Sequence, residues 1–228
     1  MRKFDFGRFI ACAALVAAPL LAGSILIAQS QPLPAPAPIM PPVLVPNHTV
    51  DLMTADGMAA FGAHWKIMEA RLVEAPLLPN TMAGYDKSFE ISPKAGASGF
   101  DDSKWQTIEP KGLGDRRGGG RVSFIWYRTN LTIPAKIGNF ETKDSTAVFT
   151  AYVDDYAEVW LNGAMPRRAG RPSPATIQGF NIPNKVVLSE KISAGDKFEL
   201  AVFGINGPIS VAPPNFIFFR EAKVDFYR

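Results

Sequence analysis

Residues 154–163 read DDYAEVWLNG, a short β-rich run that ends in a turn. The side chains of Glu158–Leu161 alternate in the manner of a strand with one buried face. Leu161-Asn162-Gly163 then supplies a turn, because Asn and Gly tolerate the positive φ angles of tight hairpins. The stretch therefore predicts antiparallel β structure.

The same pattern recurs over most of the chain. Phe198–Val202 also alternates, and Ser193-Ala194-Gly195-Asp196 supplies another turn. The predicted strands are Val122–Tyr127, Ala147–Val153, Ala157–Leu161, Lys185–Leu188, Lys197–Phe203, Asn215–Phe219 and Lys223–Tyr227. The fold class that this pattern predicts is an all-β sandwich from about Asn47 onward.

Long helices are not expected in this region, because glycine and proline interrupt the chain too often. One short helix is predicted over Thr54–Ala63, with Thr54 or Asp56 as its cap. Gly57 and Gly62 weaken that prediction, because glycine is a poor helix former.

An uncharged apolar segment precedes the sandwich. Residues 9–29 (FIACAALVAAPLLAGSILIAQ) would span roughly 30 Å as a helix, the thickness of a bilayer core. Arg2, Lys3 and Arg8 lie before it and predict a cytoplasmic N-terminus by the positive-inside rule. Residues 1–29 are therefore expected to be a retained membrane anchor, with a signal peptide cleaved near Ala28 as the alternative.

Residues 30–46 form a proline-rich tether between this segment and the sandwich. Their run QPLPAPAPIMPPVLVP favours polyproline II, which makes a semi-rigid spacer. The apolar residues within it indicate that part of the tether lies on another surface. The expected organisation is residues 1–29 as anchor or signal segment, 30–46 as tether and 47–228 as sandwich.

Composition restricts the compartment and the partners. Cys12 is the single cysteine, so an exported chain of this kind suits a bacterial envelope better than a eukaryotic secretory route. The net charge is +3, but without Arg2, Lys3, Arg8 and Asp5 the chain has 21 basic and 20 acidic residues. This near balance argues against a nucleic-acid-binding surface, which needs a concentrated basic field.

Several short strings, taken together and in order, resemble a known family. Residues 100–105 (FDDSKW), 126–128 (WYR), 131–134 (LTIP) and 154–163 (DDYAEVWLNG) are similar to the sugar-binding domain of family 2 glycosidases. Residues 201–210 (AVFGINGPIS), 214–217 (PNFI) and 220–222 (REA) resemble the C-terminal module of gluconolactonase-like propeller proteins. The resemblance implies that residues 47–228 are a galactose-binding-like jelly roll, a module that usually assists a catalytic domain.

The sequence offers few candidate catalytic residues. Glycoside hydrolysis needs two carboxyl groups facing each other across a sugar, whereas adjacent strand residues point to opposite faces. One aspartate of each doublet, Asp101-Asp102 and Asp154-Asp155, is expected to accept backbone hydrogen bonds in a turn. No cofactor is predicted. The resemblance allows a structural calcium ion, although no loop has the dense ligand spacing of a calcium site.

The remaining chemistry-bearing residues are aromatic or basic. His48 and His64 are too few and too far apart in sequence for a zinc site or a triad. Core positions are favoured over a sugar-stacking surface for Trp65, Trp105, Trp126 and Trp160, with the setting of Trp65 the most open. Six arginines in two loops are the candidate contacts for a partner or ligand: Arg116, Arg117 and Arg121, and Arg167, Arg168 and Arg171.

The sequence leads to three hypotheses about the function. The first is a non-catalytic, membrane-anchored periplasmic accessory subunit in the inner membrane, whose sandwich docks on a larger membrane protein complex. The alternative is an exported carbohydrate-binding module that recognises a glycan. A lactonase or glycosidase is the least favoured, and we expect the chain not to be an enzyme.

Overall fold

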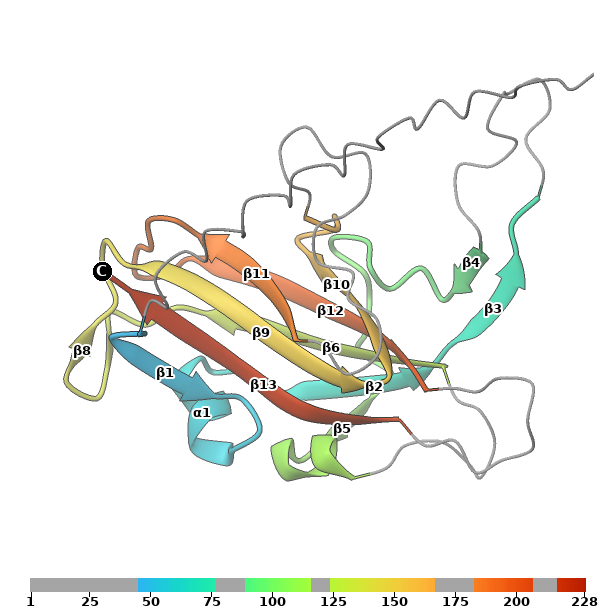
Figure 1. The fold of residues 1–228 in the computed structure, drawn as a ribbon, viewed down its shortest axis with the longest axis horizontal. Coiled ribbons are helices and arrows are strands. Elements are labelled where there is room, and N and C mark those ends of the chain that lie inside the picture. Colours follow the sequence, from blue (N-terminus) through green and yellow to red (C-terminus); the bar gives the residue numbers. More distant parts are fainter. Residues whose placement is uncertain (1–44, 77–88, 116–123, 167–182, 207–216) are drawn as a thin grey trace, which may run out of the picture. The chain divides into compact units, whose positions relative to one another are not determined.

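The computed structural model describes residues 45–76, 89–115, 124–166, 183–206 and 217–228, and in these it is an all-β sandwich of antiparallel sheets (Figure 1). Sheet A contains, in spatial order, β1 (His48–Asp51), β13 (Phe218–Tyr227), β9 (Thr146–Asp154) and β11 (Asn184–Ser189). Sheet B contains β10 (Tyr156–Leu161), β12 (Lys197–Ile205), β6 (Phe124–Thr132), β2 (Trp65–Glu69) and β5 (Gln106–Ile108).

Two small hairpins and two short helical turns complete the described elements. The hairpins are β3 (Arg71–Glu74) with β4 (Phe89–Ser92), and β7 (Lys136–Ile137) with β8 (Phe140–Glu141). The turns are the helix α1 (Ala55–Ala60) and the 3-10 helix η1 (Pro110–Gly114). Both turns contribute buried side chains to the sandwich core, namely Met58 and Leu113.

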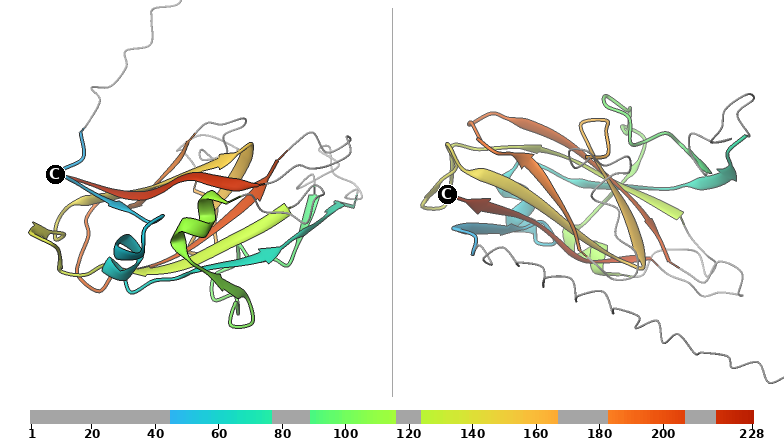
Figure 2. Two further views of the ribbon diagram at one scale, coloured as in Figure 1. Left: turned by 90° about the horizontal axis from the view of Figure 1, so that it is seen from below. Right: turned by 45° about the horizontal axis from the view of Figure 1, so that its top comes forward.

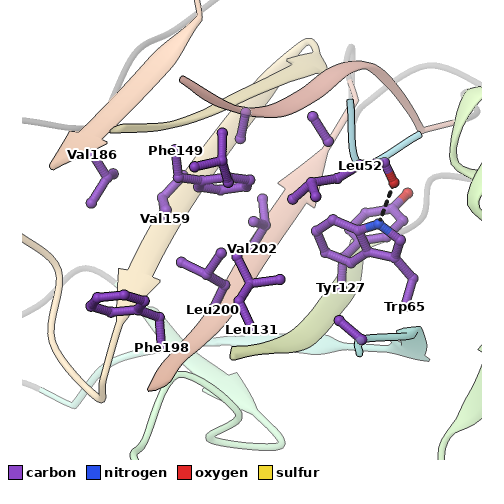
Figure 3. Close-up of a cluster of buried hydrophobic side chains, with 14 of the residues drawn as sticks. Leu52, Trp65, Tyr127, Leu131, Phe149, Val159, Val186, Phe198, Leu200 and Val202 are labelled. Atoms are coloured by element: carbon purple, nitrogen blue, oxygen red, sulfur yellow. Dashed lines mark hydrogen bonds between the residues drawn. The ribbon is translucent and has the colours of Figure 1, made fainter. Parts of the chain in front are cut away.

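The main core lies between the two sheets, which form separate layers in the left view of Figure 2. Inward residues of sheet A, such as Phe149, meet inward residues of sheet B, such as Tyr127 and Val202 (Figure 3). The Trp65 indole is fully buried there and donates from Nε1 to the Leu52 carbonyl at 2.9 Å. The buried Trp N–H thus has the partner that such a group requires.

The predicted short helix is confirmed, with its cap. Thr54 is the N-cap, and its hydroxyl accepts from the Gly57 N–H at 3.0 Å. Gly57 weakens the propensity but is required by packing, because a Cβ there would lie 1.8 Å from the Asp51 carbonyl oxygen.

The predictions of strands are confirmed for β9, β10, β11 and β12, within one or two residues. The predicted strand Val122–Tyr127 ends too early, because β6 continues to Thr132. Arg128 and Thr129 are polar yet buried within β6, since Arg128 has a charged partner described below. Because Arg128 has this partner, the strand continues through it to Thr132.

The prediction of two separate C-terminal strands, Asn215–Phe219 and Lys223–Tyr227, is wrong. A single strand, β13, covers Phe218–Tyr227 and pairs with both β1 and β9. A register shift between Phe219 and Glu221 absorbs the irregular sequence without ending the strand.

The described residues contain no helix that combines the length and the apolar character needed to cross a bilayer. The predicted anchor over residues 9–29, and the tether up to residue 44, lie outside the described residues.

Candidate functional site

The six predicted contact arginines all lie outside the described residues, in the ranges 116–123 and 167–182. Sequence reasoning placed the contacts there because both loops are basic. The described residues contain three other chemistry-bearing arrangements, two on the outer face of sheet B and one over the ends of β6 and β12.

The first arrangement is a segment, residues 93–105, that covers the outer face of sheet B; we call it the covering segment. Ala95 and Trp105 from this segment pack with Trp126, Ala201 and Phe203 in a second apolar cluster, separate from the main core. The segment is also fastened by hydrogen bonds from sheet B side chains to its carbonyls. Trp126 Nε1 donates to Pro93 at 2.9 Å, Lys66 Nζ donates to Asp102 at 3.1 Å, and Arg128 Nη1 donates to Ala95.

A buried ion cluster lies beneath the covering segment. The Arg128 side chain is 3% exposed, and its Nε lies 3.0 Å from Asp102 Oδ2. Asp102 Oδ1 lies 2.7 Å from Lys66 Nζ, so the single Asp102 carboxylate pairs with two cationic side chains. Glu199 Oε2 is 4.0 Å from Arg128 Nη2 and accepts from the Gly99 N–H at 2.8 Å. Buried charges require partners of this kind.

The FDDSKW and WYR strings therefore meet in space. Phe100 lies over the Arg128 guanidinium, with 5.4 Å from Cζ to the ring centroid, and contacts Trp105 edge-on at 5.5 Å. These residues bind the covering segment to sheet B.

The first aspartate doublet behaves as predicted. Asp101 Oδ1 accepts from the Ser103 backbone N–H at 2.9 Å, as in an Asx turn. Hydrogen bonds from the Ser103 side chain and backbone lower the pKa of Asp101. In the second doublet Asp154 Oδ2 lies 2.7 Å from Arg220 Nη2 in an ion pair.

The covering segment also contacts the Trp160 ring closely. A Cβ added at Gly96 would lie 2.5 Å from Trp160 Cδ2 and within 3 Å of two further indole carbons. Gly96→Ala is therefore expected to displace either the ring or the segment and to destabilise the fold by about 1–3 kcal/mol. Urea unfolding of the variant measures this. Gly99→Ala is not a matched control, because Gly99 has φ +67°, so Ala97→Gly in the same segment serves instead.

The tryptophan predictions are confirmed in part. Trp65, Trp105 and Trp126 are all buried, although only Trp65 lies in the main core. Trp160 is half-buried and packs edge-on against Trp126 at 6.4 Å. His64 is exposed, and His48 stacks on Phe140 with 5.0 Å between ring centroids.

The second arrangement is a half-buried carboxylate on the edge strand β10. Tyr156, Glu158 and Trp160 alternate with the inward residues Ala157 and Val159 and so share the outer face of sheet B. The Tyr156 hydroxyl donates to Glu158 Oε1 at 3.1 Å. Sequence reasoning missed this trio, although the alternation Tyr-x-Glu-x-Trp was the signal that could have identified it.

Burial raises the pKa of Glu158 above its ordinary value, while the neighbouring Tyr156 hydroxyl and Trp160 indole partly oppose the shift. The indole N–H lies near enough to lower that pKa but outside hydrogen-bonding geometry. Burial, followed by the Glu158 charge, raises the pKa of Tyr156 as well. The surroundings therefore disfavour negative charge on Glu158.

A pH-dependent stability difference follows from this shift. A carboxyl group with a raised folded-state pKa favours folding below its unfolded pKa, about 4.3, and loses that contribution as the pH rises through its folded pKa. Glu158→Gln should therefore raise the melting temperature at pH 7.5 relative to the wild type, with a smaller difference at pH 4. Thermal unfolding monitored by circular dichroism across this range measures the difference, and a difference independent of pH would contradict the assignment.

The third arrangement is an open hollow of about 320 Å³ over the ends of β6 and β12. Its lining combines polar, charged and apolar residues, namely Asn130, Leu131, Thr132, Lys197, Phe198 and Glu199. The volume is at the lower end of the range for small-molecule sites. Among the described residues, no group of three His, Cys, Asp or Glu side chains is arranged to hold a metal ion.

Comparisons with known proteins show only remote similarity. No family model matches the chain, and no curated protein sequence matches it. A β-glucuronidase from Bacteroides uniformis superposes with a TM-score of 0.42 and 19% identity, covering 78% of this chain and 18% of the enzyme. A β-glucuronidase from Faecalibacterium prausnitzii superposes with a TM-score of 0.36 and 14% identity, covering 72% of this chain and 31% of the enzyme. The chain thus spans less than a third of either enzyme.

Proposed function

We propose that residues 47–228 are a galactose-binding-like jelly-roll module without catalytic activity. We further propose that residues 9–29 hold it in the periplasm as an accessory subunit of a larger membrane protein complex. The observation that carries the non-catalytic assignment is that the Asp102 carboxylate forms ion pairs within the fold. This carboxylate is engaged by Arg128 and Lys66 beneath the covering segment, so it is committed to structure.

The other motif carboxylates support the same proposal. Asp101 accepts a turn hydrogen bond, and Asp154 pairs with Arg220. A general acid or nucleophile has to reach substrate, whereas these groups already bind the protein itself. The docking role rests on the sequence: an uncharged segment of bilayer length and a proline-rich tether that includes exposed Val45.

Fractionation of the producing cells tests the proposal. The full-length chain should stay in the membrane fraction after alkaline carbonate extraction, with Met1 intact by mass spectrometry. After mild detergent extraction it should co-elute at fixed stoichiometry with an integral membrane protein. Recovery as a free, N-terminally cleaved monomer would overturn the accessory role. Hydrolysis of aryl glycosides or lactones, abolished by a well-folded Asp102→Asn variant, would overturn the non-catalytic assignment.

The hollow over β6 and β12 favours a second candidate, an exported carbohydrate-binding module. Asn130, Lys197 and Glu199 offer both donors and acceptors, which is the chemistry that sugar hydroxyl groups require. Isothermal titration with neutral mono- and oligosaccharides tests this role. Binding that is lost in Lys197→Met would favour the carbohydrate-binding module over the docking subunit.

A further inference from the structure

Glu158 is a half-buried carboxylate for which the described residues provide no cation. Its described partner is the neutral Tyr156 hydroxyl, and no positive charge is among the causes of its pKa shift. A buried carboxylate without a counter-charge is costly, because desolvation is not repaid by Coulomb attraction. Groups of this kind are concentrated at functional sites.

Two described cations on the same face, Arg128 and Lys66, are already engaged elsewhere, and Lys197 lies six residues from Phe203 along β12. Arg128 pairs with Asp102, and Lys66 pairs with the same carboxylate. Arg128 faces Ala201, and Ala201 faces Trp160, so Arg128 lies two strands away from β10. Neither cation can neutralise Glu158 without breaking the buried ion cluster.

Aromatic side chains surround this carboxylate. Tyr156 and Trp160 flank it on β10, each two residues away on the same face. Phe203 lies directly opposite Glu158 on β12, and Phe203 in turn stacks with Phe124, with 6.5 Å between centroids. Rings around a carboxylate make a favourable environment for an organic cation, because the ring quadrupole and the negative charge act in the same direction.

We propose that Tyr156, Glu158 and Trp160 form a receptor for one cationic side chain, lysine or arginine, of the partner protein. The proposal deepens the docking function and rests on it. The negative charge of Glu158 favours a cationic side chain over a neutral ligand that offers only hydroxyl groups. Among the described residues the Trp160 N–H has no hydrogen-bond acceptor and Glu158 has no cationic partner, and a charge without a partner is the larger cost.

The binding test uses the full-length chain in detergent with small probes that imitate one side chain. N-acetyl-arginine amide and N-acetyl-lysine amide are titrated while the indole N–H resonances are followed by NMR. N-acetyl-citrulline amide, which has nearly the shape of the arginine probe without its charge, is the matched neutral ligand. At least one cationic probe should shift the Trp160 signal saturably, and the citrulline probe should bind at least ten-fold more weakly.

Variants assign the binding to these residues. Glu158→Gln should weaken the cationic probe at least ten-fold, and Tyr156→Leu should weaken it about three- to ten-fold through loss of the ring. Glu141→Gln, which removes a more exposed carboxylate that pairs with Lys136, should leave binding unchanged. Absence of saturable binding, equal binding of the citrulline probe or neutral sugars, or insensitivity to Glu158→Gln would each overturn the receptor.

The docking function is tested separately. Recovery of a stoichiometric membrane complex that Glu158→Gln does not weaken would overturn the receptor and leave the docking function intact. Probe binding to a chain that is released from cells as a free monomer would support a cation site while overturning the accessory role on which its partner assignment rests.

Discussion

Asp102→Ala is expected to destabilise the sandwich by about 3–5 kcal/mol, the usual cost of removing one partner from a buried ion pair. The variant leaves the Arg128 guanidinium, 3% exposed, without its 3.0 Å carboxylate partner, and it also removes the 2.7 Å contact with Lys66. The covering segment loses its charged attachment to sheet B as well. Urea unfolding at equilibrium, followed by tryptophan fluorescence, measures the change.

Two further variants separate burial from charge. Glu141→Ala removes an ion pair whose side chains are 63% and 54% exposed, and it should cost no more than about 1 kcal/mol. Replacing Asp102 and Arg128 together by apolar residues should cost less than Asp102→Ala alone, because no unpaired charge stays buried. A loss below about 1 kcal/mol for Asp102→Ala would show that the ion cluster does not hold the covering segment.

Phe219→Ala is expected to cost about 3–5 kcal/mol, as for other large-to-small changes at fully buried aromatic positions. Phe219 belongs to β13 of sheet A and is fully buried. Its ring contacts Tyr127 of sheet B edge-on at 4.8 Å and Trp65 at 5.6 Å. The variant therefore removes packing between the two sheets and leaves a cavity. Chemical denaturation gives the difference in unfolding free energy.

Phe89→Ala is the matched control, because it makes the same chemical change at a side chain that is 53% exposed. It should change the stability by about 0.5 kcal/mol or less. Equal effects of the two variants would contradict the assignment of Phe219 to the inter-sheet core.

Strands with a strong local pattern were predictable. Alternation at 198–202 and the turns at 161–163 and 193–196 predicted β10 and β12, because a period of two is a property of neighbouring residues. Short strands such as β1 and β5 were not predicted. Each owes its conformation to a distant partner, as β1 does to β13 about 175 residues later, and such pairing leaves no local pattern.

The candidate site was less predictable than the fold. The six arginines stand out in the sequence because they are clustered in two basic stretches, but all six lie outside the described residues. Glu158 was quoted only as part of a strand. Its importance arises from burial and from the absence of a nearby described cation, and neither property can be read from adjacent residues.

The DDYAEVWLNG stretch by itself determined a strand, its inward face and the turn that follows, because these depend on the alternation of neighbouring side chains and on the φ angles of Asn and Gly. Tertiary structure alone decided what the outward face does. Pairing with β12 placed Phe203 against Glu158, and the covering segment placed Gly96 on Trp160. Those neighbours come from elsewhere in the chain, so only folding could turn an ordinary strand residue into a half-buried carboxylate with no cation among the described residues.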